Sequence, residues 1–61
     1  MRLKQIRKGK GLSQRSLADK AKMSYTYLCN LEQGKADPSL STLKRLAKAL
    51  GVRVVELVRD E

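Results

Sequence analysis

The stretch SQRSLADKAKMSYTYLCNLEQG, residues 13–34, decides the fold, because it holds two short helical patterns separated by a tight joint. The first pattern spans residues 14–21 behind Ser13, and the second spans residues 25–32 behind Ser24. Serine is a favoured N-cap, since its hydroxyl accepts a hydrogen bond from a free backbone N–H of the first turn. Apolar residues recur three or four positions apart in both patterns, as in amphipathic helices. The stretch therefore predicts two helices that meet at a sharp turn.

Helical patterns also flank this stretch on both sides. Leu3 and Ile6 predict a short amphipathic helix over residues 2–8, which a Gly-Lys-Gly run then ends. Residues 33–38, which include glycine, aspartate and proline, predict a loop. A helix over residues 40–50 follows, capped by a serine and ended by a glycine. Its predicted apolar stripe consists of Leu40, Leu43, Leu46, Ala47 and Leu50.

The last segment allows two interpretations. Val54, Leu57 and Val58 have helical spacing over residues 54–59, but the β-branched run around Val52 also suits a strand. A single strand would have no partner elsewhere in the chain, so a helix is favoured. The sequence thus predicts an all-α fold of four to five helices.

Charge restricts the partners of this small protein. The 61 residues suit a single domain, 1–61, with a marginal core, because so short a chain buries only about 60% of its extended surface. Fourteen lysines and arginines against six acids give a formal charge of +8. A basic body of this size favours nucleic acid as a partner ahead of an anionic membrane surface. A basic surface that serves only solubility is the alternative.

The chain lacks the residues that several functional classes need. The chain has one cysteine and no histidine, which argues against a zinc site and leaves little for acid–base catalysis. We therefore expect no enzyme, no metal and no cofactor, and no small-molecule substrate is evident. There is no apolar run long enough to span a membrane and no hydrophobic signal segment. A lone thiol suits a reducing cytoplasm, so a cytoplasmic protein is expected.

Residues 12–52 resemble the phage-repressor/Cro-type (XRE) helix-turn-helix family. The residues that carry this resemblance are Leu12-Ser13-Gln14, Leu17-Ala18, Ala21, Ser24, Leu28, Leu31-Glu32, Gly34, Pro38, Leu40, Leu43, Leu46-Ala47 and Leu50-Gly51. The resemblance implies a compact, lambda-repressor-like DNA-binding domain whose second and third helices form the helix-turn-helix. It also implies sequence-specific binding of double-stranded DNA, with the third helix in the major groove.

The resemblance assigns base contacts to Tyr25, Thr26 and Asn30, with Cys29 beside them. The chemistry of these side chains agrees, because Asn30 can pair bidentately with an adenine edge and Thr26 offers a methyl group to thymine. A neutral outer face suits selection of sequence, since base contacts specify and phosphate contacts only position. The alternative is that these are ordinary solvated helix residues.

Candidate phosphate contacts surround that face. They are Gln14, Ser24, Tyr27, Lys35, Arg15 and Lys10. Gln14 opens a helix, where free N–H groups attract phosphate, and Ser24 can cap its helix, contact phosphate, or do both. For Tyr27, packing against the domain is equally expected, and for the basic residues simple solvation is the usual outcome. The resemblance further implies an ion pair between Arg7 of the first helix and Glu32 of the third.

Two positions depart from the family pattern. Lys22 stands in the turn where family members usually have glycine, so it either accepts a left-handed backbone or alters the turn. Arg53 occupies the place of a serine or aspartate cap, so the last helix is expected to fray.

The function expected from this resemblance is that of a transcriptional repressor or regulator, acting as a homodimer on a two-fold symmetric operator. The surplus of apolar residues over residues 52–58 suggests where the dimer forms. Its site of action would be a prokaryotic or phage-associated nucleoid. An alternative is an antitoxin-type interaction module that also binds its own promoter.

Overall fold

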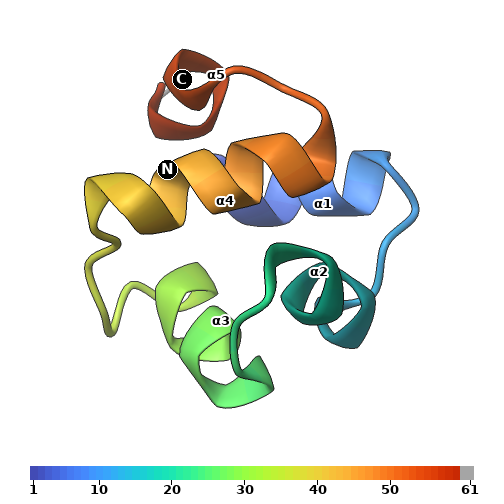
Figure 1. The fold of residues 1–61 in the computed structure, drawn as a ribbon, viewed down its shortest axis with the longest axis vertical. Helices are drawn as coiled ribbons and strands as arrows, with labels where there is room; N and C mark the ends of the chain where they lie inside the picture. The colour runs from blue at the N-terminus through green and yellow to red at the C-terminus, as the bar shows by residue number, and fades with distance from the viewer. Residues whose placement is uncertain (60–61) are drawn as a thin grey trace.

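The computed structural model describes residues 1–59, and its helices follow one another in the order that the sequence predicts (Figure 1). Those residues form α1 (Leu3–Gly9), α2 (Gln14–Ala21), α3 (Tyr25–Glu32), α4 (Leu40–Leu50) and α5 (Val54–Val58), with no strand among them. The prediction of an all-α fold with a helix-turn-helix at the second and third helices is confirmed. The strand considered around Val52 does not form.

Serine hydroxyls start three of the helices. The Oγ atoms of Ser13 and Ser24 each accept a backbone N–H from three residues later at 3.0 Å, and that of Ser39 does so at 3.2 Å. Each bond satisfies one of the N–H groups that a helix start leaves unpaired. The start of α3 is therefore fixed by a local signal.

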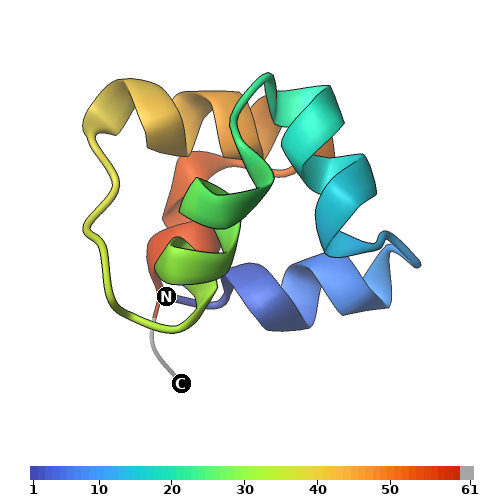
Figure 2. The same ribbon diagram turned by 90° about the horizontal axis from the view of Figure 1, so that it is seen from below.

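The core lies between α4 and the other helices. In Figure 1, α4 runs across the middle of the molecule, with α5 on one side and the α2–α3 pair on the other. The buried apolar residues are Leu3, Leu17, Ala18, Ala21, Leu28, Leu31, Leu46, Ala47, Leu50 and Leu57. Each fully buried leucine stabilises the fold by roughly 1.5–3 kcal/mol relative to an exposed one. Figure 2, from below, shows α2 and α3 together on one face, with α4 along one edge and α1 along the opposite edge.

The predicted apolar stripe of α4 is wrong at its first residue. Leu40 is 62% exposed, because the first turn of α4 lies at the rim of the molecule, where no other helix covers it (Figure 1). The buried residue of that turn is Thr42, whose hydroxyl hydrogen bonds to the Ser39 hydroxyl at 2.9 Å.

The last helix compensates for its poor cap. Arg53 gives no side-chain cap, but the Glu56 carboxylate accepts the Arg53 backbone N–H at 2.8 Å, which is one half of a capping box. Leu57 is fully buried, and its carbonyl accepts the Arg2 backbone N–H at 2.7 Å. Helix α5 is thus tied to the start of α1.

Candidate nucleic-acid interface

Helix α3 divides its residues between the core and solvent. Leu28 and Leu31 are 0% and 3% exposed, so they fix the rotation of the helix about its axis. The opposite side presents four residues, which we call the recognition face: Tyr25, Thr26, Cys29 and Asn30. The first two are exposed and the last two half-buried. All four predicted base-contacting residues therefore share one outward side of one helix.

Two members of the recognition face have polar groups available for a ligand. Within residues 1–59, neither the Thr26 hydroxyl nor the Asn30 amide makes a hydrogen bond to another side chain. The backbone carbonyl of Asn30 is occupied, because it accepts the Lys35 N–H at 2.8 Å. This bond holds the loop after α3 against the helix while it leaves the Asn30 side chain unengaged.

The Tyr25 ring is held by a neighbour from α2. The guanidinium carbon of Arg15 lies 4.7 Å from the centre of the Tyr25 ring, a cation–π contact. Such a contact at an exposed site is worth roughly 0.5–1 kcal/mol. Arg15, a predicted phosphate contact, thus also positions an aromatic residue of the recognition face.

A buried charge network holds the C-terminal end of α3. Arg7, only 6% exposed, donates from Nε to Glu32 Oε2 at 2.6 Å and from Nη2 to Oε1 at 3.1 Å. Its Nη1 donates to the Leu12 carbonyl at 2.7 Å. Gln14 completes the network, because its Nε2 donates to Glu32 Oε1 at 3.0 Å. The network joins α1, α2 and α3, and the participation of Gln14 was not predicted.

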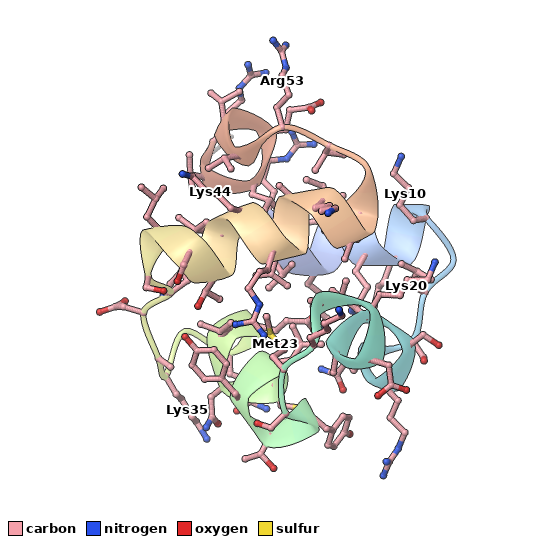
Figure 3. All side chains as sticks on the ribbon, viewed as in Figure 1. Lys10, Lys20, Met23, Lys35, Lys44 and Arg53 are labelled. Carbon is pink, nitrogen blue, oxygen red and sulfur yellow. The ribbon has the colours of Figure 1, made fainter. Side chains whose placement is uncertain are left out.

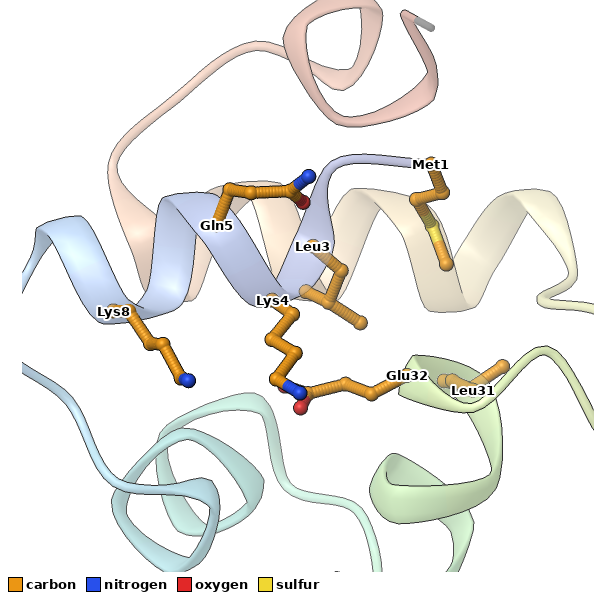
Figure 4. Close-up of a pocket in the computed structure, with 7 residues that line it drawn as sticks. All are labelled: Met1, Leu3, Lys4, Gln5, Lys8, Leu31 and Glu32. Atoms are coloured by element: carbon orange, nitrogen blue, oxygen red, sulfur yellow. The ribbon is translucent and has the colours of Figure 1, made fainter.

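A hollow of about 400 Å³ opens beside this network, between α1 and the end of α3 (Figure 4). It is lined by Met1, Leu3, Lys4, Gln5, Lys8, Leu31 and Glu32. In Figure 4 the Lys4 side chain runs from α1 in the direction of Glu32. The negative charge of Glu32 is offset by its ion pair with Arg7.

The turn before α3 contains the residue that departs from the family pattern. Lys22 has φ 57° and ψ 50°, the left-handed conformation that favours glycine. The Met23 N–H bonds to the Ala18 carbonyl at 3.0 Å across this turn. Lys22 therefore accepts the strained backbone, at a cost of about 1–2 kcal/mol.

An arginine of α4 secures the same turn, and sequence reasoning missed it. Arg45 Nε donates to the Ala21 carbonyl at 3.1 Å, and its Nη2 donates to the Lys22 carbonyl. These carbonyls lie at the end of α2, where a helix leaves acceptors unpaired. No local pattern in the sequence singles out Arg45, and only the unusual Lys22 pointed to a need for support here.

The remaining phosphate candidates lie around the recognition face. Ser24 uses its oxygen to accept the Tyr27 N–H, and its hydroxyl proton stays available. Tyr27 is half-buried and packs against the core. Lys35 and Lys10 are exposed and lie far apart, on opposite sides of the α2–α3 pair in Figure 3.

Other kinds of site find no support in the described residues. Residues 1–59 contain no group of three or more cysteine and acidic side chains placed to hold a metal ion. None of the helices formed by those residues is long and apolar enough to cross a bilayer.

Comparison with known proteins agrees with this geometry. Residues 3–57 match the family model described as helix-turn-helix. The chain is 47% identical over 60 residues to an immunity repressor protein of Bacillus phage phi105, an alignment that covers 98% of this chain and 42% of the repressor. It is 40% identical over 57 residues to the HTH-type transcriptional regulator DdrOP3 of Deinococcus deserti, which covers 93% of this chain and 44% of the regulator. The chain thus spans less than half the length of these two relatives.

A solved structure extends the likeness to three dimensions. The restriction-modification controller protein C.AhdI from Aeromonas hydrophila superposes with a TM-score of 0.90 at 38% sequence identity. The match covers 92% of this chain and 85% of the controller protein.

Proposed function

Because the chain belongs to the helix-turn-helix family of phage-repressor (XRE) type, we propose that it binds double-stranded DNA at specific sequences, with α3 in the major groove. The observation that carries this proposal is the recognition face: short, uncharged side chains on one outward side of α3, in a chain of formal charge +8. Uncharged groups that reach base edges select sequence, while lysines in the same place would bind any duplex.

On this proposal, the side chains of the recognition face contact the bases. Asn30 accepts and donates hydrogen bonds at an adenine edge, and Thr26 packs its methyl group against thymine. Tyr25 lies at the start of α3, with its ring centre 4.7 Å from the guanidinium carbon of Arg15, and contacts a base from there. Cys29 lies next to Asn30 on the same face.

Phosphate contacts come from the residues around the recognition face: Gln14, Ser24, Tyr27, Lys35, Arg15 and Lys10. The Gln14 amide donates one hydrogen bond to Glu32, and its second N–H can donate to a phosphate oxygen. The half-buried Tyr27 would contribute only its hydroxyl.

The protein acts as a transcriptional regulator, and as a homodimer on a two-fold symmetric site in the cytoplasm of a bacterial cell. A dimer doubles the small contact area of one module and places two α3 helices about one DNA turn, ~34 Å, apart. The exposed Val55 and Val58 of α5, at 50% and 45%, supply an apolar surface for this association.

Selection of bound sites from a random duplex library tests the proposal directly. We expect an enriched consensus with two-fold symmetry, and affinity for it that falls steeply with salt. Enrichment of a single, asymmetric site would contradict the dimer. The absence of any enriched sequence would contradict specific recognition.

A further inference from the structure

A second concentration of positive charge lies where the C-terminal ends of α2 and α4 meet. A hollow of about 480 Å³ there is lined by Lys20, Ala21, Lys22, Arg45, Lys48 and Ala49. Four of these six residues are cations, two are alanines, and no carboxylate lines the hollow. All four cations are exposed. We call this feature the lysine hollow.

Helix ends account for only part of this charge. Lys20 lies in the last turn of α2 and Lys48 in the last turn of α4, where cations stabilise the negative end of a helix. Each end carries roughly half a negative charge, so two ends offset about one of the four cations. Arg45 is engaged by the carbonyls of Ala21 and Lys22. The lysines therefore leave an excess of positive charge.

Lys22 contributes to that excess from a strained position. Its φ of 57° lies where glycine is usual, yet a lysine stands there and lines the hollow. Strained residues often mark sites whose side chains have a use.

The lysine hollow borders the recognition face. Lys22 comes two residues before Ser24, the N-cap of α3. In Figure 2 the α2–α3 turn lies beside α4 at one edge of the face that α2 and α3 form. A duplex seated on the recognition face would therefore have the lysine hollow at one edge of its contact surface.

We propose that the lysine hollow binds backbone phosphates of the same duplex whose bases α3 contacts. This inference rests on the proposed function and adds to it three lysines, Lys20, Lys22 and Lys48. An acidic protein segment is the other polyanion that would suit the charge, but the position beside the recognition face favours DNA.

The test compares two double variants that lose the same charge. Lys20→Gln/Lys48→Gln removes two cations of the hollow, and Lys44→Gln/Arg53→Gln removes two exposed cations on the α5 side of α4 (Figure 3). On the selected duplex we expect the first variant to make the slope of log affinity against log salt shallower by about 2, at ~0.9 per phosphate. The ranking of single-base variants of the site should not change. The control should keep the wild-type slope.

A single substitution separates binding from folding. Lys22→Gly removes a charge and also the backbone strain, so its unfolding midpoint should be no lower than that of the wild type, while its affinity for duplex DNA falls severalfold. Unfolding therefore cannot account for the loss.

The outcomes distinguish the two proposals. If the wild type binds duplex DNA and the Lys20/Lys48 variant has the same salt slope as the control, this inference is overturned while the proposed function stands. The same holds if that variant keeps its DNA slope but loses binding to poly-glutamate, which would assign the hollow to an acidic protein. If the wild type binds no duplex, the proposed function fails and this inference fails with it.

Discussion

The two ends of α3 are held in opposite ways. At the C-terminal end, Glu32 is clamped by Arg7 and Gln14 in a network whose two charged side chains are only 8% and 2% exposed. At the N-terminal end, the support is the exposed Arg45, which donates to backbone carbonyls of a turn strained at Lys22. Buried charges depend strongly on their partners, whereas exposed groups have water as an alternative. We therefore expect the fold to depend on the first end more than on the second.

The largest effect should follow from breaking the buried pair. Arg7→Ala leaves the Glu32 carboxylate buried without its ion partner, so the free energy of unfolding should fall by about 3–5 kcal/mol. Urea unfolding measures this loss, with Lys8→Ala, an exposed neighbour on the same helix, as the control that should change little. Glu32→Ala should also destabilise, and the double variant should lose less than the sum. Additive losses would show that the two residues do not interact.

Substitution of Asn30 on α3, or of Lys35 in the loop after it, should change binding rather than folding. Asn30→Ala should cost about 1–3 kcal/mol on the selected site and relax discrimination at one base pair, because it removes a bidentate base contact. Lys35→Ala should instead weaken specific and random DNA alike and make the salt slope shallower by about 1. Affinities for the site and its single-base variants measure both. A changed ranking for Lys35→Ala with an unchanged one for Asn30→Ala would reverse the two roles.

At the exposed end, removal of the arginine should have a smaller effect on stability. Arg45→Ala removes two hydrogen bonds to backbone carbonyls, one of them at the exposed Lys22, so the loss in unfolding free energy should be roughly 1 kcal/mol. The neighbouring Lys44→Ala is the matched control. A loss as large as that of Arg7→Ala would remove the contrast between the two ends of α3.

The smallest change should be one that relieves strain. Lys22→Gly relieves the strain of a left-handed lysine, and this relief stabilises the folded state by about 1–2 kcal/mol. The added glycine makes the unfolded chain more flexible, which offsets roughly 0.5–1 kcal/mol of that gain. The net gain in unfolding free energy should be slight, and Lys20→Gly, inside α2, should destabilise instead. A clear loss of stability for Lys22→Gly would mean that its side chain supports the turn.

Local signals made the helices predictable. The serine caps and the spacing of apolar residues predicted α2, α3 and α4 at their observed bounds, and α1 and α5 to within one residue at their ends. Burial at the rim was not predictable in this way, since Leu40 fits the stripe of α4 but has no neighbour to cover it. Whether a side chain is buried depends on what packs against it.

Contacts between distant residues were harder to foresee. The link from Arg45 to Ala21 and Lys22 and the link from Gln14 to Glu32 depend on how helices cross, which no local pattern encodes. The residues of the recognition face could be named in advance because the family resemblance assigns them, and they lie on the side of α3 away from Leu28 and Leu31. Its contacts with bases, and those of its neighbours with phosphates, stay predictions.

On the proposed function, the division of α3 into anchoring and outward residues would make the DNA target exchangeable. Leu28 and Leu31 hold the helix in place, and exposed residues such as Tyr25 and Thr26 contribute little to the core. Substitutions at such positions usually change stability by within about 0.5 kcal/mol. Chains that differ only on this side could share one scaffold yet choose different operators, so new regulators can arise, or be engineered, without rebuilding the protein.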